Sequence, residues 1–142
     1  MFFEDFTLNA EYDIEPAYID KEKMIDFARL YDNIPLHTDE EYAKSTHFGA
    51  LIAPGVMSFM SVWVNFLALN LFGNEIIAGK STSMEWHKPV YAGDTLTGKA
   101  VISSLSPRNE KNGIVEVTVY IYNQHGALVL TDVTQTVVKR RV

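Results

Sequence analysis

The sequence predicts an α+β fold in which a curved antiparallel β-sheet wraps around one long central helix. Apolar residues in the first half of the chain recur at helical spacing, whereas the second half alternates apolar and polar residues between short turns. Strands joined by short turns pair antiparallel, and such a sheet must bury one face. The only large apolar partner for that face is the uncharged run at 54–72. We therefore expect one domain, residues 1–142.

The composition is that of an ordinary globular protein, and it removes several functional classes. Of the 142 residues, 47% are hydrophobic and 21% are charged, and the formal net charge is −6. This charge argues against a general nucleic-acid-binding protein, which presents a basic face. The absence of cysteine excludes disulfides, thiolate nucleophiles and cysteine-based zinc sites. The N-terminus lacks the pattern of a signal peptide, so we expect a cytoplasmic protein.

Two short helices are expected before the central one. Residues 20–31 begin with Asp20, a possible N-cap, and their apolar side chains follow helical spacing. Residues 32–37 then form a loop. Thr38 has Glu41 three positions later, which is a capping-box pattern and predicts a helix over 38–46.

The central helix is predicted over 54–72, with Pro54 in its first turn and Gly73 as its stop. The surrounding uncharged run is long enough to span a bilayer, but the Pro-Gly pair and several polar residues favour a helix buried in a folded domain, with no membrane partner. One polar stripe crosses this apolar helix, formed by Ser58, Ser61 and Asn65. The stripe faces either solvent or a substrate tunnel, and the sequence favours neither.

The second half of the chain is expected to form the sheet. Strands are predicted at residues 76–89, 95–105, 114–123 and 127–139. Turn signals separate them at Ala92-Gly93-Asp94, Asn112-Gly113 and Asn123–Gly126. The aromatic residues Tyr91, Tyr120 and Tyr122 are interpreted as sheet packing.

A carboxylate and an imidazole mark the candidate site. Asp32 and His37 lie five residues apart around Pro35, shortly before the N-terminus of the central helix. An acid/base pair beside a helix N-terminus suits proton transfer, because the free N–H groups there can receive negative charge. Such a site fits a substrate whose carbonyl becomes an enolate.

Three blocks of the sequence resemble the MaoC-like, (R)-specific enoyl-CoA hydratases, which have the hot-dog fold. The blocks are Asp32, Pro35, His37 and Ala43, similar to D-x-N-P-x-H-x5-A; Phe48–Gly55, similar to the approach to the central helix; and Trp86–Leu96, similar to F-x-x-P-V-x-x-G-D-x-L. Together they cover most of the chain.

The resemblance implies a hydratase or dehydratase acting on enoyl thioesters. It implies that Asp32 and His37 are the catalytic pair and that the backbone N–H of Gly55 is the oxyanion donor. The neighbouring substrate-binding residues would be Asn33, Ile52 and Pro54. It further implies an acyl-CoA or acyl carrier protein thioester as substrate, no cofactor or metal, and a homodimer or a dimer-based oligomer.

The chain departs from the family pattern at three positions, which changes the expected pocket lining. Ile34 replaces the asparagine of the first motif, Pro54 replaces a frequent histidine, and Trp63 falls where some hydratases carry an active-site serine. Two alternatives therefore stay open. One is a non-catalytic module that binds an acyl group or a partner protein. The other is a thioesterase, which the lack of Asp or Glu in 54–72 disfavours.

The remaining histidines and the basic C-terminus are not expected to act in catalysis. The spacing of His47, His87 and His125 matches no metal-binding motif. The run Lys139-Arg140-Arg141 is interpreted as solvated, although it could contact a phosphate of CoA.

Overall fold

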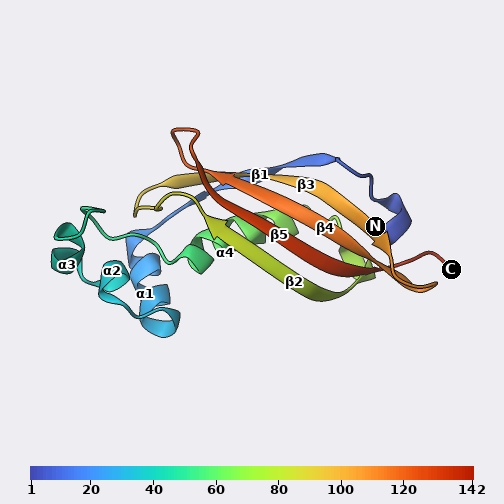
Figure 1. Cartoon of the computed structure of the whole chain (residues 1–142), viewed down its shortest axis with the longest axis horizontal. Coiled ribbons are helices and arrows are strands. Elements are labelled where there is room, and N and C mark those ends of the chain that lie inside the picture. The colour runs from blue at the N-terminus through green and yellow to red at the C-terminus, as the bar shows by residue number, and fades with distance from the viewer.

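The computed structural model describes all 142 residues and contains one five-stranded sheet. The strands are β1 (Glu11–Tyr18), β2 (Ile76–Trp86), β3 (Thr95–Pro107), β4 (Asn112–Tyr122) and β5 (Leu128–Lys139). Their order across the sheet is β1-β3-β4-β5-β2, and every neighbouring pair is antiparallel. Figure 1 shows the sheet as a long, curved layer with both termini near one end.

The helices lie on one face of the sheet and at one end of it. They are α1 (Lys21–Tyr31), α2 (Pro35–Thr38), α3 (Glu40–Lys44) and α4 (Gly55–Leu67), with 3-10 turns at Phe3–Asp5 and Gly73–Glu75. The central helix α4 runs along the sheet and contacts β1 and β3 most extensively. The three shorter helices gather at the end far from the termini (Figure 1). This arrangement confirms the predicted α+β fold with a curved sheet around one central helix.

The core lies between α4 and the inner face of the sheet. Four side chains of β4 are completely buried there, at Val115, Val117, Val119 and Ile121, as the alternating pattern of this strand predicts. From α4, Val62 and Phe66 fill the same space. Gly98 of β3 allows the helix to come close, because a Cβ there would lie 2.6 Å from Cγ1 of Val62.

The central helix is shorter than predicted. It spans Gly55–Leu67, and the chain then turns, with Asn70 in the left-handed region at φ 55°. The N–H groups of Leu69 and Asn70 donate to carbonyl oxygens three residues earlier, so the last turn tightens into 3-10 geometry. Gly73 belongs to the following 3-10 turn and is not the stop of the helix. No helix is long and apolar enough to cross a membrane.

The short helices also differ from the prediction. The expected loop at 32–37 already contains the start of α2 at Pro35. The next helix begins at Glu40, and its N-cap is Asp39, whose carboxylate accepts a hydrogen bond from the N–H of Tyr42. The capping box predicted at Thr38 is wrong, because Thr38 ends α2 and its hydroxyl donates to the carbonyl oxygen of Ile34. Aspartate is the better N-cap of the two.

The first strand was not predicted. β1 pairs only with β3 and forms one edge of the sheet. Its pairing shifts register between Ile14 and Ala17, and Pro16 lies in this irregularity. Proline fits an edge strand at such a position, because it has no N–H to contribute to the sheet. The shift also breaks the alternation by which a strand is recognised in a sequence.

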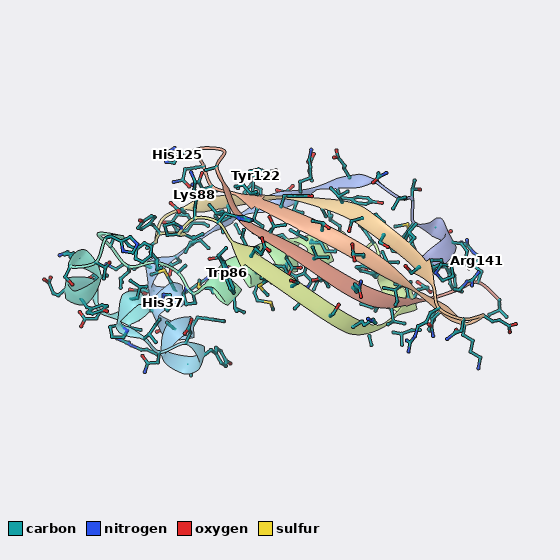
Figure 2. All side chains as sticks on the ribbon, in the orientation of Figure 1. His37, Trp86, Lys88, Tyr122, His125 and Arg141 are labelled. Atoms are coloured by element: carbon teal, nitrogen blue, oxygen red, sulfur yellow. The ribbon has the colours of Figure 1, made fainter.

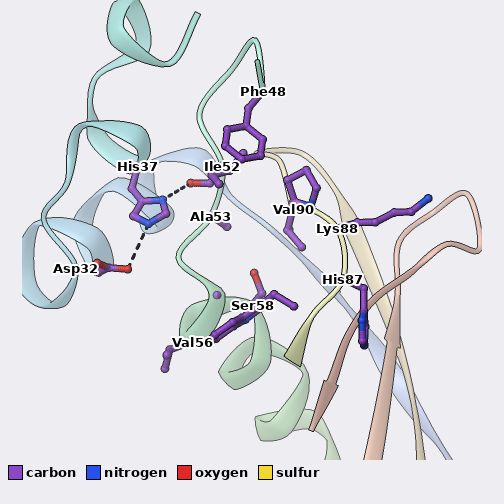
Figure 3. Close-up of a pocket in the computed structure, with 13 residues that line it drawn as sticks. Asp32, His37, Phe48, Ile52, Ala53, Val56, Ser58, His87, Lys88 and Val90 are labelled. Carbon is purple, nitrogen blue, oxygen red and sulfur yellow. Dashed lines mark hydrogen bonds and ion pairs between the residues drawn. The ribbon is translucent and has the colours of Figure 1, made fainter. Parts of the chain in front are cut away.

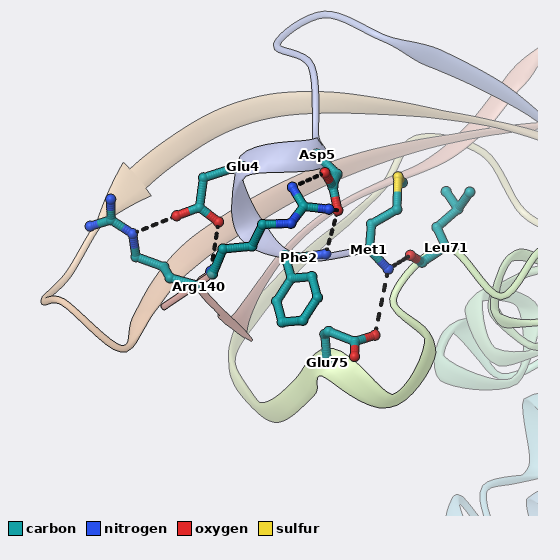
Figure 4. A network of polar contacts seen from close by, with 8 residues as sticks. Met1, Phe2, Glu4, Asp5, Leu71, Glu75 and Arg140 are labelled. Carbon is teal, nitrogen blue, oxygen red and sulfur yellow. Dashed lines mark hydrogen bonds and ion pairs between the residues drawn. The ribbon is translucent and has the colours of Figure 1, made fainter.

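The ends of the chain are tied to each other by ion pairs. Arg140 Nε donates to Glu4 over 2.8 Å, and Arg141 pairs with Asp5 over 2.5 Å (Figure 4). These hydrogen bonds hold the pKa of both carboxyls below their usual values. Arg140 and Arg141 therefore have specific partners at the surface, where the Arg141 side chain stays 58% exposed.

Besides the edge of β1, two surfaces have no partner within the single chain. One is the outer edge of β2, which pairs only with β5 and is exposed along nearly its whole length. The other is an apolar stripe on the flank of α4, formed by the exposed side chains of Val56, Met60, Val64 and Leu67. A free strand edge beside exposed apolar side chains is typical of a surface that another chain covers.

Candidate active site

A cavity of about 440 Å³ lies where the short helices meet the N-terminus of α4 and the end of β2. Figure 2 places His37 and Trp86 in this part of the molecule, far from Arg141. The residues that line it are Asp32, His37, Phe48, Ile52, Ala53, Gly55, Val56, Ser58, Trp86, His87, Lys88, Pro89 and Val90. Its size suits a small-molecule ligand.

Local structure brings Asp32 and His37 together. Asp32 is the C-cap of α1, and its N–H donates to the carbonyl oxygen of Ala28. Pro35 begins α2 because its fixed φ suits the first position of a helix. The chain reverses between these two helices, so the Asp32 Oδ2 atom lies 3.3 Å from the Nε2 atom of His37 (Figure 3).

The other nitrogen of His37 fixes its tautomer. Nδ1 lies 2.7 Å from the carbonyl oxygen of Ile52, which can only accept a hydrogen bond, so Nδ1 carries a proton. In the neutral ring Nε2 is therefore an acceptor, and it faces the carboxylate of Asp32, also an acceptor. The His37 side chain is 7% exposed and that of Asp32 is 46% exposed. A water molecule can lie within hydrogen-bond reach of both atoms.

The segment before α4 is held by hydrogen bonds on both sides. The N–H of Ala53 donates to the carbonyl oxygen of Val90 over 2.7 Å, and the Tyr91 hydroxyl donates to that of Phe48 over 3.1 Å. The sequence analysis interpreted Tyr91 as sheet packing. In the structure its hydroxyl also anchors a loop of the site. This anchoring fixes the Ile52 carbonyl that orients His37.

Gly55 presents a free N–H to the same cavity. It is the first residue of α4, and no acceptor in the chain pairs with its N–H, whereas the N–H of Ser58 donates to the carbonyl oxygen of Pro54. The indole of Trp86 lies directly against this glycine. A Cβ at position 55 would be only 2.1 Å from Nε1 of Trp86.

The structure assembles most of the predicted site residues but not all of them. Asp32, His37, Ile52 and Gly55 line the cavity together. Asn33 is exposed outside the lining, and the buried ring of Pro54 does not reach it.

The three residues of the polar stripe on α4 make different contacts. Ser58 is 1% exposed and lines the cavity, as a substrate tunnel would require. The Ser61 hydroxyl donates to the carbonyl oxygen of Met57 within the helix. The Asn65 amide instead donates to the carbonyl oxygen of Glu15, linking α4 to β1.

The sequence interpretation did not place Trp86, His87 and Lys88 in the site. They follow one another at the end of β2 and line the cavity. His87 was expected to be non-catalytic, and its Nε2 lies 2.9 Å from the Thr131 hydroxyl. The signal that could have found them is their position directly before Pro89-Val90 in the third motif.

The glycine and aspartate of the third motif have a structural role. Gly93 has a φ of 88°, a conformation that favours glycine. The buried carboxylate of Asp94 accepts hydrogen bonds from the N–H of Tyr91 and from the amide of Gln124, both over 2.9 Å. No group of three or more His, Asp or Glu side chains is arranged to hold a metal ion.

Comparison with known proteins places this chain in a family. The profile of the FAS1-like, dehydratase domain region matches residues 8–132. The chain therefore belongs to the MaoC-like dehydratase family of hot-dog proteins. It is also 27% identical to the uncharacterised protein YdeM of Bacillus subtilis, over 99% of this chain and 100% of that protein.

Three solved structures illustrate the similarity, each 27% identical to this chain. A monoamine oxidase regulatory protein from Archaeoglobus fulgidus has a TM-score of 0.95, covering 100% of this chain and 96% of the other. A MaoC-like dehydratase from Rhodospirillum rubrum has a TM-score of 0.90, with coverage of 100% and 99%. The (R)-hydratase from A. caviae involved in PHA biosynthesis has a TM-score of 0.76, with coverage of 97% and 99%.

Proposed function

We propose that this protein is a hydratase or dehydratase that adds water reversibly to a trans-2-enoyl thioester, giving a 3-hydroxyacyl thioester. The observation that carries the proposal is the proximity of Oδ2 of Asp32 and Nε2 of His37, 3.3 Å apart in one cavity with the free N–H of Gly55. The dehydratase family to which the chain belongs supports the same class of reaction.

The acceptor pair can hold and activate one water molecule. As the water oxygen bonds to C3 of the substrate, one acceptor takes a proton from it, and the enolate that forms then receives this proton at C2. Hydroxyl and hydrogen are thus added across the double bond, and the pair returns to its starting state. No redox partner is consumed, and we propose that the reaction uses no cofactor or metal.

The substrate carbonyl needs a partner while it carries the enolate charge. We assign this role to the backbone N–H of Gly55, which has no acceptor in the chain and lies at the positive end of the α4 dipole. In this assignment Ile52 acts through its carbonyl, which orients His37. Pro54 acts only by starting the helix, and we assign no substrate contact to Asn33.

The free β2 edge and the apolar stripe of α4 support a homodimer. We propose that two subunits pair β2 with β2, because a two-fold axis makes the two copies of an edge strand antiparallel. The stripe lies on the flank of α4 that β1 and β3 leave uncovered, so a second subunit can bury it. Among similar structures, HadBC, the 3R-hydroxyacyl-ACP dehydratase of Mycobacterium tuberculosis, is a complex.

The decisive experiment incubates the purified protein with trans-2-enoyl-CoA thioesters of increasing chain length and with matching acyl carrier protein thioesters. Hydration is followed by loss of the conjugated enoyl absorbance and confirmed by mass spectrometry of the product. We expect turnover of at least one member. A protein that binds these thioesters without hydrating them would be an acyl-binding module. Release of free thiol would indicate a thioesterase, although α4 contains no carboxylate.

A further inference from the structure

We propose that the indole N–H of Trp86 is a second hydrogen-bond donor to the thioester oxygen, alongside the N–H of Gly55. The inference rests on the proposed function and adds a residue to its oxyanion site. Trp86 ends β2 and lines the cavity, whereas Gly55 begins α4. The two residues come from distant parts of the chain and meet at the point where negative charge would develop.

The nitrogen-bearing edge of the indole is the part that faces Gly55. From an ideal Cβ on Gly55, the nearest atoms are Nε1 at 2.1 Å, Cε2 at 2.3 Å and Cζ2 at 2.8 Å, all of Trp86. Because a Cα–Cβ bond is ~1.5 Å long, Nε1 lies within about 3.6 Å of the Gly55 Cα. Adding the ~1.5 Å N–Cα bond, the two nitrogens are at most ~5.1 Å apart, so an oxygen atom ~2.9 Å from both fits between them.

The indole N–H is also uncommitted. Indole nitrogen only donates, and no acceptor within the subunit pairs with that of Trp86, which is 55% exposed. The other polar side chains of the cavity have partners: His37 Nδ1 is bonded to Ile52, and His87 Nε2 contacts Thr131. Lys88 has no partner either, but Figure 3 shows its side chain directed away from His37 and Asp32.

A second donor matches the needs of the oxyanion. An enolate oxygen has more than one lone pair, and each prepositioned N–H that bonds to it lowers the barrier. The small Gly55 is what lets the indole approach this closely, since any side chain at position 55 would occupy the same space.

The test removes the N–H and keeps the aromatic ring. In Trp86→Phe we expect kcat to fall on the order of 10²-fold, with a much smaller change in KM, since the donor acts mainly on the transition state. Incorporating 3-benzothienylalanine at position 86 replaces the N–H by sulfur in the same bicyclic shape, and it should reproduce the loss. Tyr120→Phe, which removes one aromatic donor outside the cavity, is the matched control and should keep full activity.

A spectroscopic reading separates hydrogen bonding from shape. The carbonyl stretch of a bound 3-hydroxyacyl-CoA, labelled with ¹³C at C1, should lie at lower frequency in the wild type than in either variant. Equal carbonyl frequencies and equal kcat in wild type and both variants would overturn the Trp86 inference and leave the proposed function standing. If the variants changed only the chain-length preference, Trp86 would act by steric contact with the acyl chain, and the proposed hydrogen bond would also be overturned. A wild type without turnover would overturn the proposed function itself.

Discussion

The Nδ1–H of His37 donates to the carbonyl oxygen of Ile52 over 2.7 Å, and this contact determines what the opposite side of the ring can do. In the neutral ring it leaves Nε2 as the acceptor, and this atom lies 3.3 Å from Oδ2 of Asp32. Ile52 belongs to the segment that leads into α4, so the loop carrying the acid/base pair is joined directly to the helix that carries Gly55.

Loss of either member of the acid/base pair should abolish most activity. We expect Asp32→Asn and His37→Ala each to lower kcat on the order of 10²- to 10⁴-fold on the best thioester. Circular dichroism and melting curves serve as the control, because Asp32 is half-exposed and His37 contributes one hydrogen bond to the backbone. Near wild-type turnover in both variants would refute the assignment.

Gly55→Ala should reduce turnover with little effect on melting temperature. The new Cβ displaces the half-exposed indole of Trp86, which can rotate away, and the backbone of Gly55 is helical and accepts alanine. A displaced oxyanion donor costs about 3 kcal/mol of transition-state stabilisation. Kinetics of Gly55→Ala in the Trp86→Ala background give the control, since the substitution should then be less harmful. Equal losses in both backgrounds would show that Trp86 is not involved.

The oligomeric state follows from the stripe on α4 and the edge of β2. We expect light scattering at micromolar concentration to give twice the subunit mass of 16.0 kDa, or a multiple of it. Met60→Lys should shift the protein toward the monomer, because it places a charge in the apolar stripe. Leu30→Lys, on the exposed face of α1, is the matched control. A monomeric wild type would contradict the proposed pairing.

Asp132 should make stability depend on pH. It is completely buried in β5, where its carboxylate accepts hydrogen bonds from Thr82, over 2.5 Å, and from Thr134. Burial raises its pKa above the ordinary value of 3.8, although these hydrogen bonds oppose the shift. The folded state therefore binds more protons than the unfolded state, and the free energy of unfolding falls as pH rises from 3.8 to the raised pKa.

Urea unfolding at a series of pH values tests this sign. Glu4, Asp5 and Glu40 have lowered pKa values and act in the opposite direction, so the comparison uses the difference between Asp132→Asn and wild type. The free energy of unfolding of Asp132→Asn, relative to that of the wild type, should increase as the pH rises from 3.8 to the raised pKa of Asp132. Parallel curves would mean that Asp132 ionises in the folded state as readily as in the unfolded chain.

The sequence was sufficient for the elements with strong periodicity. β4 was predicted to within two residues because its alternation is unbroken, and α1 was found from its Asp20 cap and apolar spacing. β1 was not predicted, because the register shift around Pro16 interrupts the alternation of its side chains. The end of α4 was misplaced because apolar residues continue past Leu67 into a turn, and composition alone does not show where a helix tightens.

The candidate site was predictable only where residues close in sequence form it. Asp32 and His37 are five positions apart, so their pairing follows from the loop between two helices. Trp86 and Gly55 are distant in sequence and meet only in the folded structure. Ile52 contacts His37 through its backbone carbonyl, which every residue has, so the residue type gives no signal. Asn33 looked equally suitable, but the turn that presents Asp32 leaves Asn33 facing solvent.

The central claim, that Asp32 and His37 act on one water molecule, is tested most directly by a double-mutant cycle. Hydration rates of Asp32→Asn, His37→Ala and the double variant are measured on the best enoyl thioester, with the folded fraction of each determined by calorimetry. If the pair acts as a unit, either single substitution already removes most of the rate, and the double variant should be little slower than the worse single one. Losses that multiply in the double variant would contradict the account, because the two residues would then act independently.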